Sequence, residues 1–152
     1  EAFGRAVTLD PRHVHANANL ARVLAALGRI PESIDHYRRA LALDPDNAMV
    51  LRNLAWLLAC HRDEKYRNPT EAVALAERAC ALTSGGDVRA RDTLAAAYAS
   101  VGRCAEAATV AERAAAEARA RGWNDLAARI EKRVELYRSN QPVRLGPGIP
   151  IE

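Results

Sequence analysis

The sequence has few aromatic side chains and few glycines. Only 5% of its 152 residues are aromatic and eight are glycine, whereas 49% are hydrophobic, with alanine and leucine the main contributors. So few large side chains do not suit a thick core, but many small ones let helices pack closely. Because alanine and leucine are good helix formers, this composition predicts helix along nearly the whole chain.

Long hydrophobic runs are missing as well. A helix that spans a membrane needs about 18 to 20 consecutive apolar residues, and the sequence contains no such run. A signal peptide cannot be recognised either. The net charge of +3 is mild, with both signs interspersed. We therefore expect neither a membrane nor a nucleic acid as partner.

Cysteine is scarce, and its spacing excludes the common cysteine-based sites. Three cysteines without a CxxC spacing favour reduced thiols in a cytoplasmic protein and no metal site. On antiparallel helices Cys60 and Cys80 would lie roughly 16 Å apart along the axis, which is too far for a disulfide. Cys104 falls on the same edge as Cys60, so a bond between these two stays open.

Catalytic motifs are also absent. The sequence has no glycine-rich phosphate loop, no HExxH and no Gly-x-Ser-x-Gly. Its four histidines are scattered over predicted surfaces, and its carboxylates are typical of solvated helix faces. We expect no enzyme activity and no cofactor.

A complete helical hairpin can be recognised between residues 18 and 45. Gly28 stands at the turn, and Pro31 falls in the first turn of the second helix, where proline is well tolerated. Small residues alternate with large ones on the facing sides, as two closely packed helices require. These positions are Leu20, Ala21, Leu24, Ser33, Tyr37 and Ala40.

The hairpin is echoed 34 residues away in both directions. The echoes are Phe3, Ala6 and Pro11 upstream and Asn53, Leu54, Ala55 and Leu58 downstream. This order and period resemble the tetratricopeptide repeat, a helical hairpin that stacks into a solenoid. Residues 54–60 and 136–142 also resemble segments of bacterial proteins with many such repeats.

The resemblance implies an all-α fold, a right-handed solenoid of antiparallel hairpins. We expect a half repeat over residues 1–11, full repeats over 12–45, 46–87 and 88–122, a capping helix over 123–139 and an extended Pro/Gly tail over 140–152. The repeat at 46–87 carries a long polar turn over residues 60–68. Because the chain opens inside a repeat, we expect it to be a piece of a longer protein.

Several helix ends are marked in the sequence. Asn47 is a predicted N-cap, and Asn68, Pro69 and Glu71 together predict a second helix start. Gly122 is a predicted helix stop. The capping helix carries one apolar stripe, formed by Trp123, Leu126, Ala127, Ile130, Val134 and Tyr137. The tail is expected to stay extended unless its apolar residues, Val143, Leu145, Ile149 and Ile151, dock in a groove.

The candidate binding residues lie on the first helix of each repeat, which lines the concave face of such a solenoid. Asn19 and Asn53 are equivalent positions, and they resemble the asparagine ladder in the repeat region of O-linked N-acetylglucosamine transferase, where amides hold a substrate backbone. The three arginines of the set, Arg22, Arg52 and Arg89, would form a cationic strip suited to acidic peptides. Trp56 would either anchor a partner side chain or pack beneath the long turn. The full set is His15, Asn19, Arg22, Arg52, Asn53, Trp56, Arg89, Asp92 and Thr93.

These features predict a protein–protein interaction scaffold that binds an extended peptide or a partner helix in its concave groove. One alternative is a repeat region that presents substrate to a larger enzyme, such as a glycosyltransferase. Another is a homo-oligomer that forms through open repeat ends or through the tail.

Overall fold

The computed structural model describes residues 13–146, and within that range it confirms the all-α prediction. Seven α-helices and one short 3-10 helix follow one another without a strand in these residues: α2 (Val14–Ala26), α3 (Ile30–Leu43), α4 (Ala48–Cys60), η1 (Glu64–Tyr66), α5 (Pro69–Leu82), α6 (Val88–Ser100), α7 (Cys104–Ala120) and α8 (Asn124–Arg138). The half repeat expected over 1–11 lies outside the described residues, as do Ile149 and Ile151. None of the described helices is both long and apolar enough to cross a membrane.

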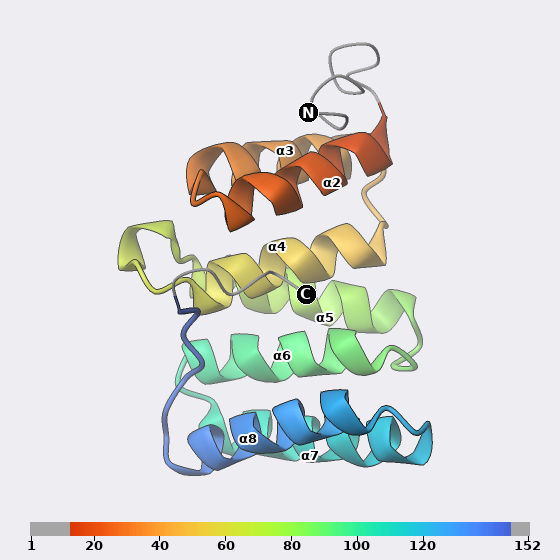
Figure 1. The fold of residues 1–152 in the computed structure, drawn as a ribbon, viewed down its shortest axis with the longest axis vertical. Helices are drawn as coiled ribbons and strands as arrows, with labels where there is room; N and C mark the ends of the chain where they lie inside the picture. Colours follow the sequence, from red (N-terminus) through yellow and green to blue (C-terminus); the bar gives the residue numbers. More distant parts are fainter. Residues whose placement is uncertain (1–12, 147–152) are drawn as a thin grey trace.

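The helices pair as hairpins that stack along one direction (Figure 1). The pairs α2–α3, α4–α5 and α6–α7 pack closely. Helix α6 then packs against both α4 and α5, whereas α3 meets α4 over a smaller area. At the other end α8 packs chiefly against α7. Helix α7 therefore packs closely against both α6 and α8.

The helix ends follow the capping residues predicted from the sequence. The Asn47 side chain accepts a hydrogen bond from the Val50 amide at 3.2 Å. Asn68 accepts one from the Glu71 amide at 3.2 Å and donates one to the Glu71 carboxylate at 2.8 Å. Gly122 follows α7 with a φ of +76°, a backbone conformation that suits glycine after a helix. These local signals fix where the chain turns.

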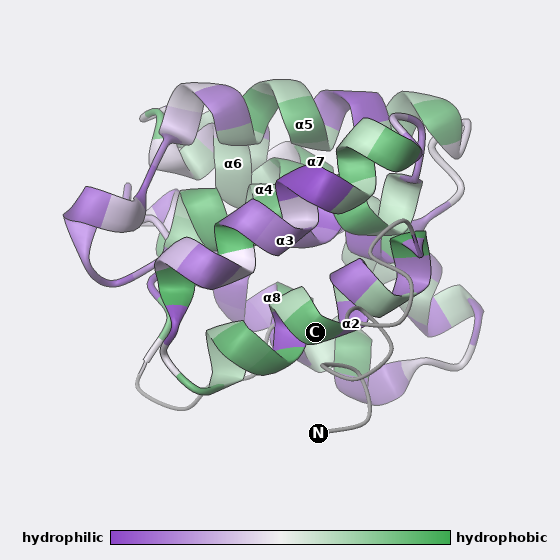
Figure 2. Cartoon of the chain, turned by 90° about the horizontal axis from the view of Figure 1, so that it is seen from above, coloured by the Kyte–Doolittle hydropathy of each residue, from purple (hydrophilic) through white to green (hydrophobic). Residues whose placement is uncertain are grey.

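The core is built largely from alanine. The inward positions of α5 and α7 are fully buried alanines: Ala72, Ala76 and Ala79, and Ala107, Ala111 and Ala114. Because these side chains are so small, the helices can approach closely, and a few large residues such as Tyr37 and Leu54 fill what remains. The helices in front in Figure 2 carry both hydrophobic and hydrophilic residues.

The long polar turn between α4 and α5 is an ordered structure. Its η1 helix begins after Asp63, whose amide donates to the His61 ring at 3.0 Å. The His61 and Tyr66 rings meet edge to face at 5.0 Å between centroids. Arg67 donates to the His61 carbonyl at 3.1 Å. This turn projects beside the stack and is mostly hydrophilic (Figures 1 and 2).

The segment after α8 returns to the end of α4 (Figure 1). The Leu145 amide donates to the Cys60 carbonyl at 2.8 Å, and the Arg144 guanidinium lies 3.4 Å from the Ala59 carbonyl oxygen. Val143 and Leu145 pack against the core. Of the four tail residues expected to dock if a groove was present, these two do so.

Candidate functional site

Six of the nine predicted binding residues lie around one small depression. Helices α4 and α6 supply them at helical spacing: Arg52, Asn53, Trp56, Arg89, Asp92 and Thr93. The depression has a volume of about 20 Å³, room for about one water molecule rather than a side chain. A peptide bound here would therefore lie across the surface, not in a deep pocket.

The remaining three predicted residues, on α2, are set apart from this depression. His15 and Arg22 are exposed, and Asn19 is half-buried. None of them lines the depression between α4 and α6. The structure thus divides the predicted set into a compact group of six and an outlying group of three.

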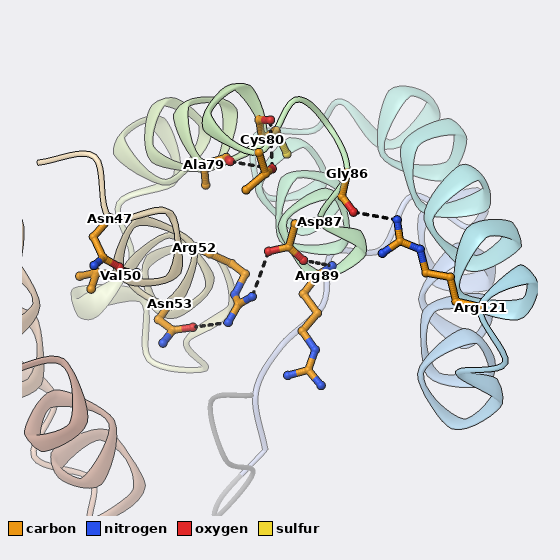
Figure 3. Close-up of polar contacts among 11 residues, drawn as sticks. Asn47, Val50, Arg52, Asn53, Ala79, Cys80, Gly86, Asp87, Arg89 and Arg121 are labelled. Atoms are coloured by element: carbon orange, nitrogen blue, oxygen red, sulfur yellow. Dashed lines mark hydrogen bonds and ion pairs between the residues drawn. The ribbon is translucent and has the colours of Figure 1, made fainter. Parts of the chain in front are cut away.

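Arg52 joins α4 to the start of α6. Its guanidinium forms an ion pair with Asp87 at 3.2 Å and lies 3.5 Å from the Asn53 side-chain oxygen. The Asp87 side chain also caps α6, because it accepts a hydrogen bond from the Arg89 backbone amide at 2.9 Å (Figure 3). Arg52 is thereby oriented by the protein, and its charge is compensated in part.

Four of the residues predicted to be available for binding on the concave face are in fact buried. The exposed fractions are 6% for Asn53, 8% for Trp56, 6% for Asp92 and 4% for Thr93. The sequence pattern showed that they share a face but did not show what covers that face.

Part of the cover is Arg133 of α8, which the sequence analysis did not single out. Its guanidinium forms an ion pair with Asp92 and lies 4.7 Å from the centre of the Trp56 ring. A cation over an indole face is attracted by the ring electrons. The sequence predicted that Trp56 would either anchor a partner side chain or pack beneath the long turn. Neither prediction includes the contact with Arg133. Arg133 stands one residue before Val134 of the apolar stripe. This position was the only feature of the sequence that could have indicated its contact with the α4–α6 face.

The charges on this face do not cancel. Arg52 is matched by Asp87 and Arg133 by Asp92. Within residues 13–146, no carboxylate pairs with Arg22, and none pairs with the guanidinium of Arg89, which points away from Asp87 in Figure 3. The face therefore keeps an excess of positive charge.

Helix α3 buries a phenol, the side chain of Tyr37. Burial raises the pKa of Tyr37 to about 12, and the positive charges of Arg22 and Arg52 oppose this rise. The hydroxyl therefore stays protonated near neutral pH. Arg22 of α2 and Arg52 of α4 thus both act on the same buried phenol.

The thiols and the acidic residues offer no metal centre within the described part of the chain. No group of three or more His, Cys, Asp or Glu side chains there is placed to hold an ion. All three cysteines are free, so the Cys60–Cys104 bond that the sequence left open is not formed. Burial raises the pKa of Cys60 to about 12 and that of Cys80 to about 11. Both are therefore poor nucleophiles near neutral pH.

Comparison with known proteins relates the chain to helical repeat proteins. Residues 1–48 match the family described as tetratricopeptide repeat. A solved structure of PilW, described as a widely conserved type IV pilus biogenesis factor, superposes with a TM-score of 0.67 at 20% identity. The superposition covers 91% of this chain and 66% of PilW, so the chain spans just under two thirds of that protein.

A second solved structure, that of MamA, superposes with a TM-score of 0.57 at 18% identity, and covers 91% of this chain and 85% of MamA. At such identities the superpositions support the fold. A search of curated protein sequences gave no match.

Proposed function

We propose that this tetratricopeptide-repeat protein is an interaction scaffold that binds an extended acidic segment of a partner protein across the face formed by α2, α4 and α6. The observation that carries the proposal is the pair Arg22 and Arg89. Both are exposed and neither guanidinium has a carboxylate partner among the described residues. They stand on the outer two of the three helices, with the oriented Arg52 on the middle one.

Guanidinium groups in such a row suit a carboxylate-rich chain. Each presents a planar set of N–H donors that a carboxylate can accept two at a time. Arg52 and Arg133 already have acidic neighbours, so the net attraction comes from Arg22 and Arg89. Since these side chains are exposed, the attraction should weaken as salt is added.

The two asparagines have different roles in this proposal. Asn19 is half-buried, so its amide can meet a peptide unit of the bound segment. Asn53 is buried and lies 3.5 Å from the Arg52 guanidinium. Asn53 therefore acts by orienting Arg52. Among the described residues, Asn19 is then the one asparagine of the predicted ladder that contacts the bound segment directly.

The test measures binding of fluorescent unstructured peptides of equal length, one rich in Asp and Glu and one in Lys. Fluorescence anisotropy should detect the acidic peptide and not the basic one. The double variant Arg22→Glu/Arg89→Glu should weaken acidic binding by at least about tenfold, because it replaces attraction with repulsion at two sites.

A matched control separates this face from a general charge effect. Arg62→Glu/Arg113→Glu changes the net charge by the same amount at two exposed positions elsewhere. It should leave most of the affinity intact. Equal losses in both variants, or no difference between the two peptides in the unmodified chain, would refute the proposal.

A further inference from the structure

An open groove lies between α7 and α8, away from the face described above. It has a volume of about 310 Å³. Its lining residues are Glu112, Ala115, Ala116, Arg119, Glu131, Val134, Glu135 and Arg138. The described chain after α8 runs toward Cys60 at the end of α4 and not into this groove.

The two helices line the groove with the same pattern. In α7, Glu112 is followed seven residues later by Arg119, and in α8, Glu131 is followed seven residues later by Arg138. Seven residues are about two helical turns, so each pair stands on one side of its helix, roughly 10 Å apart. At these four positions each wall has one acidic and one basic side chain. Glu135 of α8 is a fifth charge on the rim, and its carboxylate lies 3.8 Å from the Arg138 guanidinium.

Because α7 and α8 are antiparallel, at these positions the acidic side chain of each wall faces the basic side chain of the other. Arg119 pairs with Glu131 at 2.6 Å, and Arg138 pairs with Glu112 at 2.8 Å. The four charges form an alternating square, with the signs reversed along both directions. All four side chains are 44% to 59% exposed, so each can accept a further partner.

The floor between the charges is small and apolar. Ala115 and Val134 are buried in it, and Ala116 is exposed beside them. Small side chains at these positions let another helical surface approach closely. The groove therefore joins an apolar centre to a charged rim, as protein interfaces do.

We propose that this groove binds the same groove of a second copy of the chain. An alternating square of charges is complementary to its own copy when two such faces meet about a two-fold axis lying in the interface. Each of the four side chains of the square then gains an opposite charge from the partner, while Glu135 keeps its place beside Arg138 of its own chain. A partner surface of one sign would instead be repelled by half of the square. This dimer leaves the α2–α4–α6 face free and does not depend on its function.

The first test is the concentration dependence of mass for the full chain by analytical ultracentrifugation. The unmodified chain should pass from monomer to dimer as its concentration rises. Ala116→Arg should raise the dimer dissociation constant by at least about tenfold, because it fills the floor and adds a charge. Ala74→Arg, at an exposed alanine of α5, is the control for adding arginine to a helix surface. Circular dichroism checks that both variants are folded.

A complete charge inversion gives the sharper test. The variant Glu112→Arg/Arg119→Glu/Glu131→Arg/Arg138→Glu retains both ion pairs within the chain with their signs exchanged. It should pair with itself and not with the unmodified chain, because like charges would then meet at all four corners. Energy transfer between labelled chains measures this sorting.

Three outcomes would overturn the proposal. One is an unmodified chain that stays monomeric at every concentration. The second is an Ala116→Arg variant that dimerises as the unmodified chain does. The third is an inverted variant that mixes freely with the unmodified chain.

Discussion

The two sides of α8 meet different surroundings. The inner side buries Ile130 and Tyr137 and sends Arg133 to Asp92 and Trp56. The outer side presents Glu131 and Arg138 to an open groove. The same helix therefore closes one surface of the molecule and leaves another available. The difference shows that a candidate binding face must be judged by what the rest of the chain places on it.

The ion pairs on the two sides also differ in their surroundings. The side chains of Arg133 and Asp92 are 15% and 8% exposed, whereas those of Arg119 and Glu131 are 53% and 44% exposed. Water screens the outer pair, so it adds little to stability. Both side chains of the inner pair are largely desolvated, so breaking that pair costs more. The stability of the chain should thus depend on the inner side of α8.

The largest expected effect is that of Tyr137→Ala. Tyr137 is fully buried, so truncation should lower the free energy of unfolding by about 4 kcal/mol, from lost burial and the cavity that remains. Leu136→Ala, at the neighbouring partly exposed position, should cost about 1 kcal/mol or less. Urea denaturation followed by circular dichroism measures both. Equal losses would mean that α8 does not pack as described.

The next effect compares the two ion pairs directly. Arg133→Ala should destabilise the chain by about 3 kcal/mol, because it removes a largely buried guanidinium that pairs with Asp92 and packs over the Trp56 ring. Arg119→Ala should cost about 0 to 1 kcal/mol, since its pair is exposed. Thermal and urea unfolding of the two variants provide the comparison. A larger loss for Arg119→Ala would contradict the account of the two sides.

A third prediction concerns alkaline pH and the thiol beneath the returning segment. The pKa of Cys60 is raised from 9.0 to about 12 by burial, so the unfolded chain loses this proton at lower pH than the folded chain. The stability that this thiol contributes is present below pH 9 and is lost as the pH rises toward 12. By pH 11 the loss should be about 3 kcal/mol.

The variant Cys60→Ala separates the contribution of the Cys60 thiol to the pH dependence of stability from that of other groups that titrate in the same range. The variant should lose less stability between pH 8 and 11 than the unmodified chain, whatever its stability at pH 8. Chemical denaturation at a series of pH values measures the two slopes. Identical slopes would show that the Cys60 thiol is not buried as the structure has it.

Sequence reasoning predicted the features that depend on local residue order. Asn47 and Asn68 cap helices because their side chains reach amides three residues on, and such contacts depend on short spacings. Helical spacing also placed Arg52, Asn53 and Trp56 beside Arg89, Asp92 and Thr93. The contact of Arg133 with Asp92 joins residues 41 positions apart, and it depends on the angle at which α8 crosses. No local pattern specifies that angle, so the cover over Trp56 and Asp92 was missed.

The smallest expected effect is a gain in stability from removing one oxygen on the inner side of α8. The Tyr137 hydroxyl is buried and has no hydrogen-bond partner among the described residues. A buried hydroxyl without a partner has lost its hydrogen bonds to water, and no hydrogen bond within the protein compensates for that free-energy cost. Tyr137→Phe should therefore raise the free energy of unfolding by about 1 kcal/mol.

Tyr98→Phe is the matched control, because the Tyr98 hydroxyl donates to the Glu77 carboxylate at 3.0 Å on the surface. That variant should be neutral or slightly destabilised in the same urea titration. If Tyr137→Phe were destabilised as well, the hydroxyl would have a partner, such as a bound water, on the inner side of α8. The two variants together thus test whether the Tyr137 hydroxyl, on the closely packed inner side of α8, lacks a hydrogen bond in the folded chain.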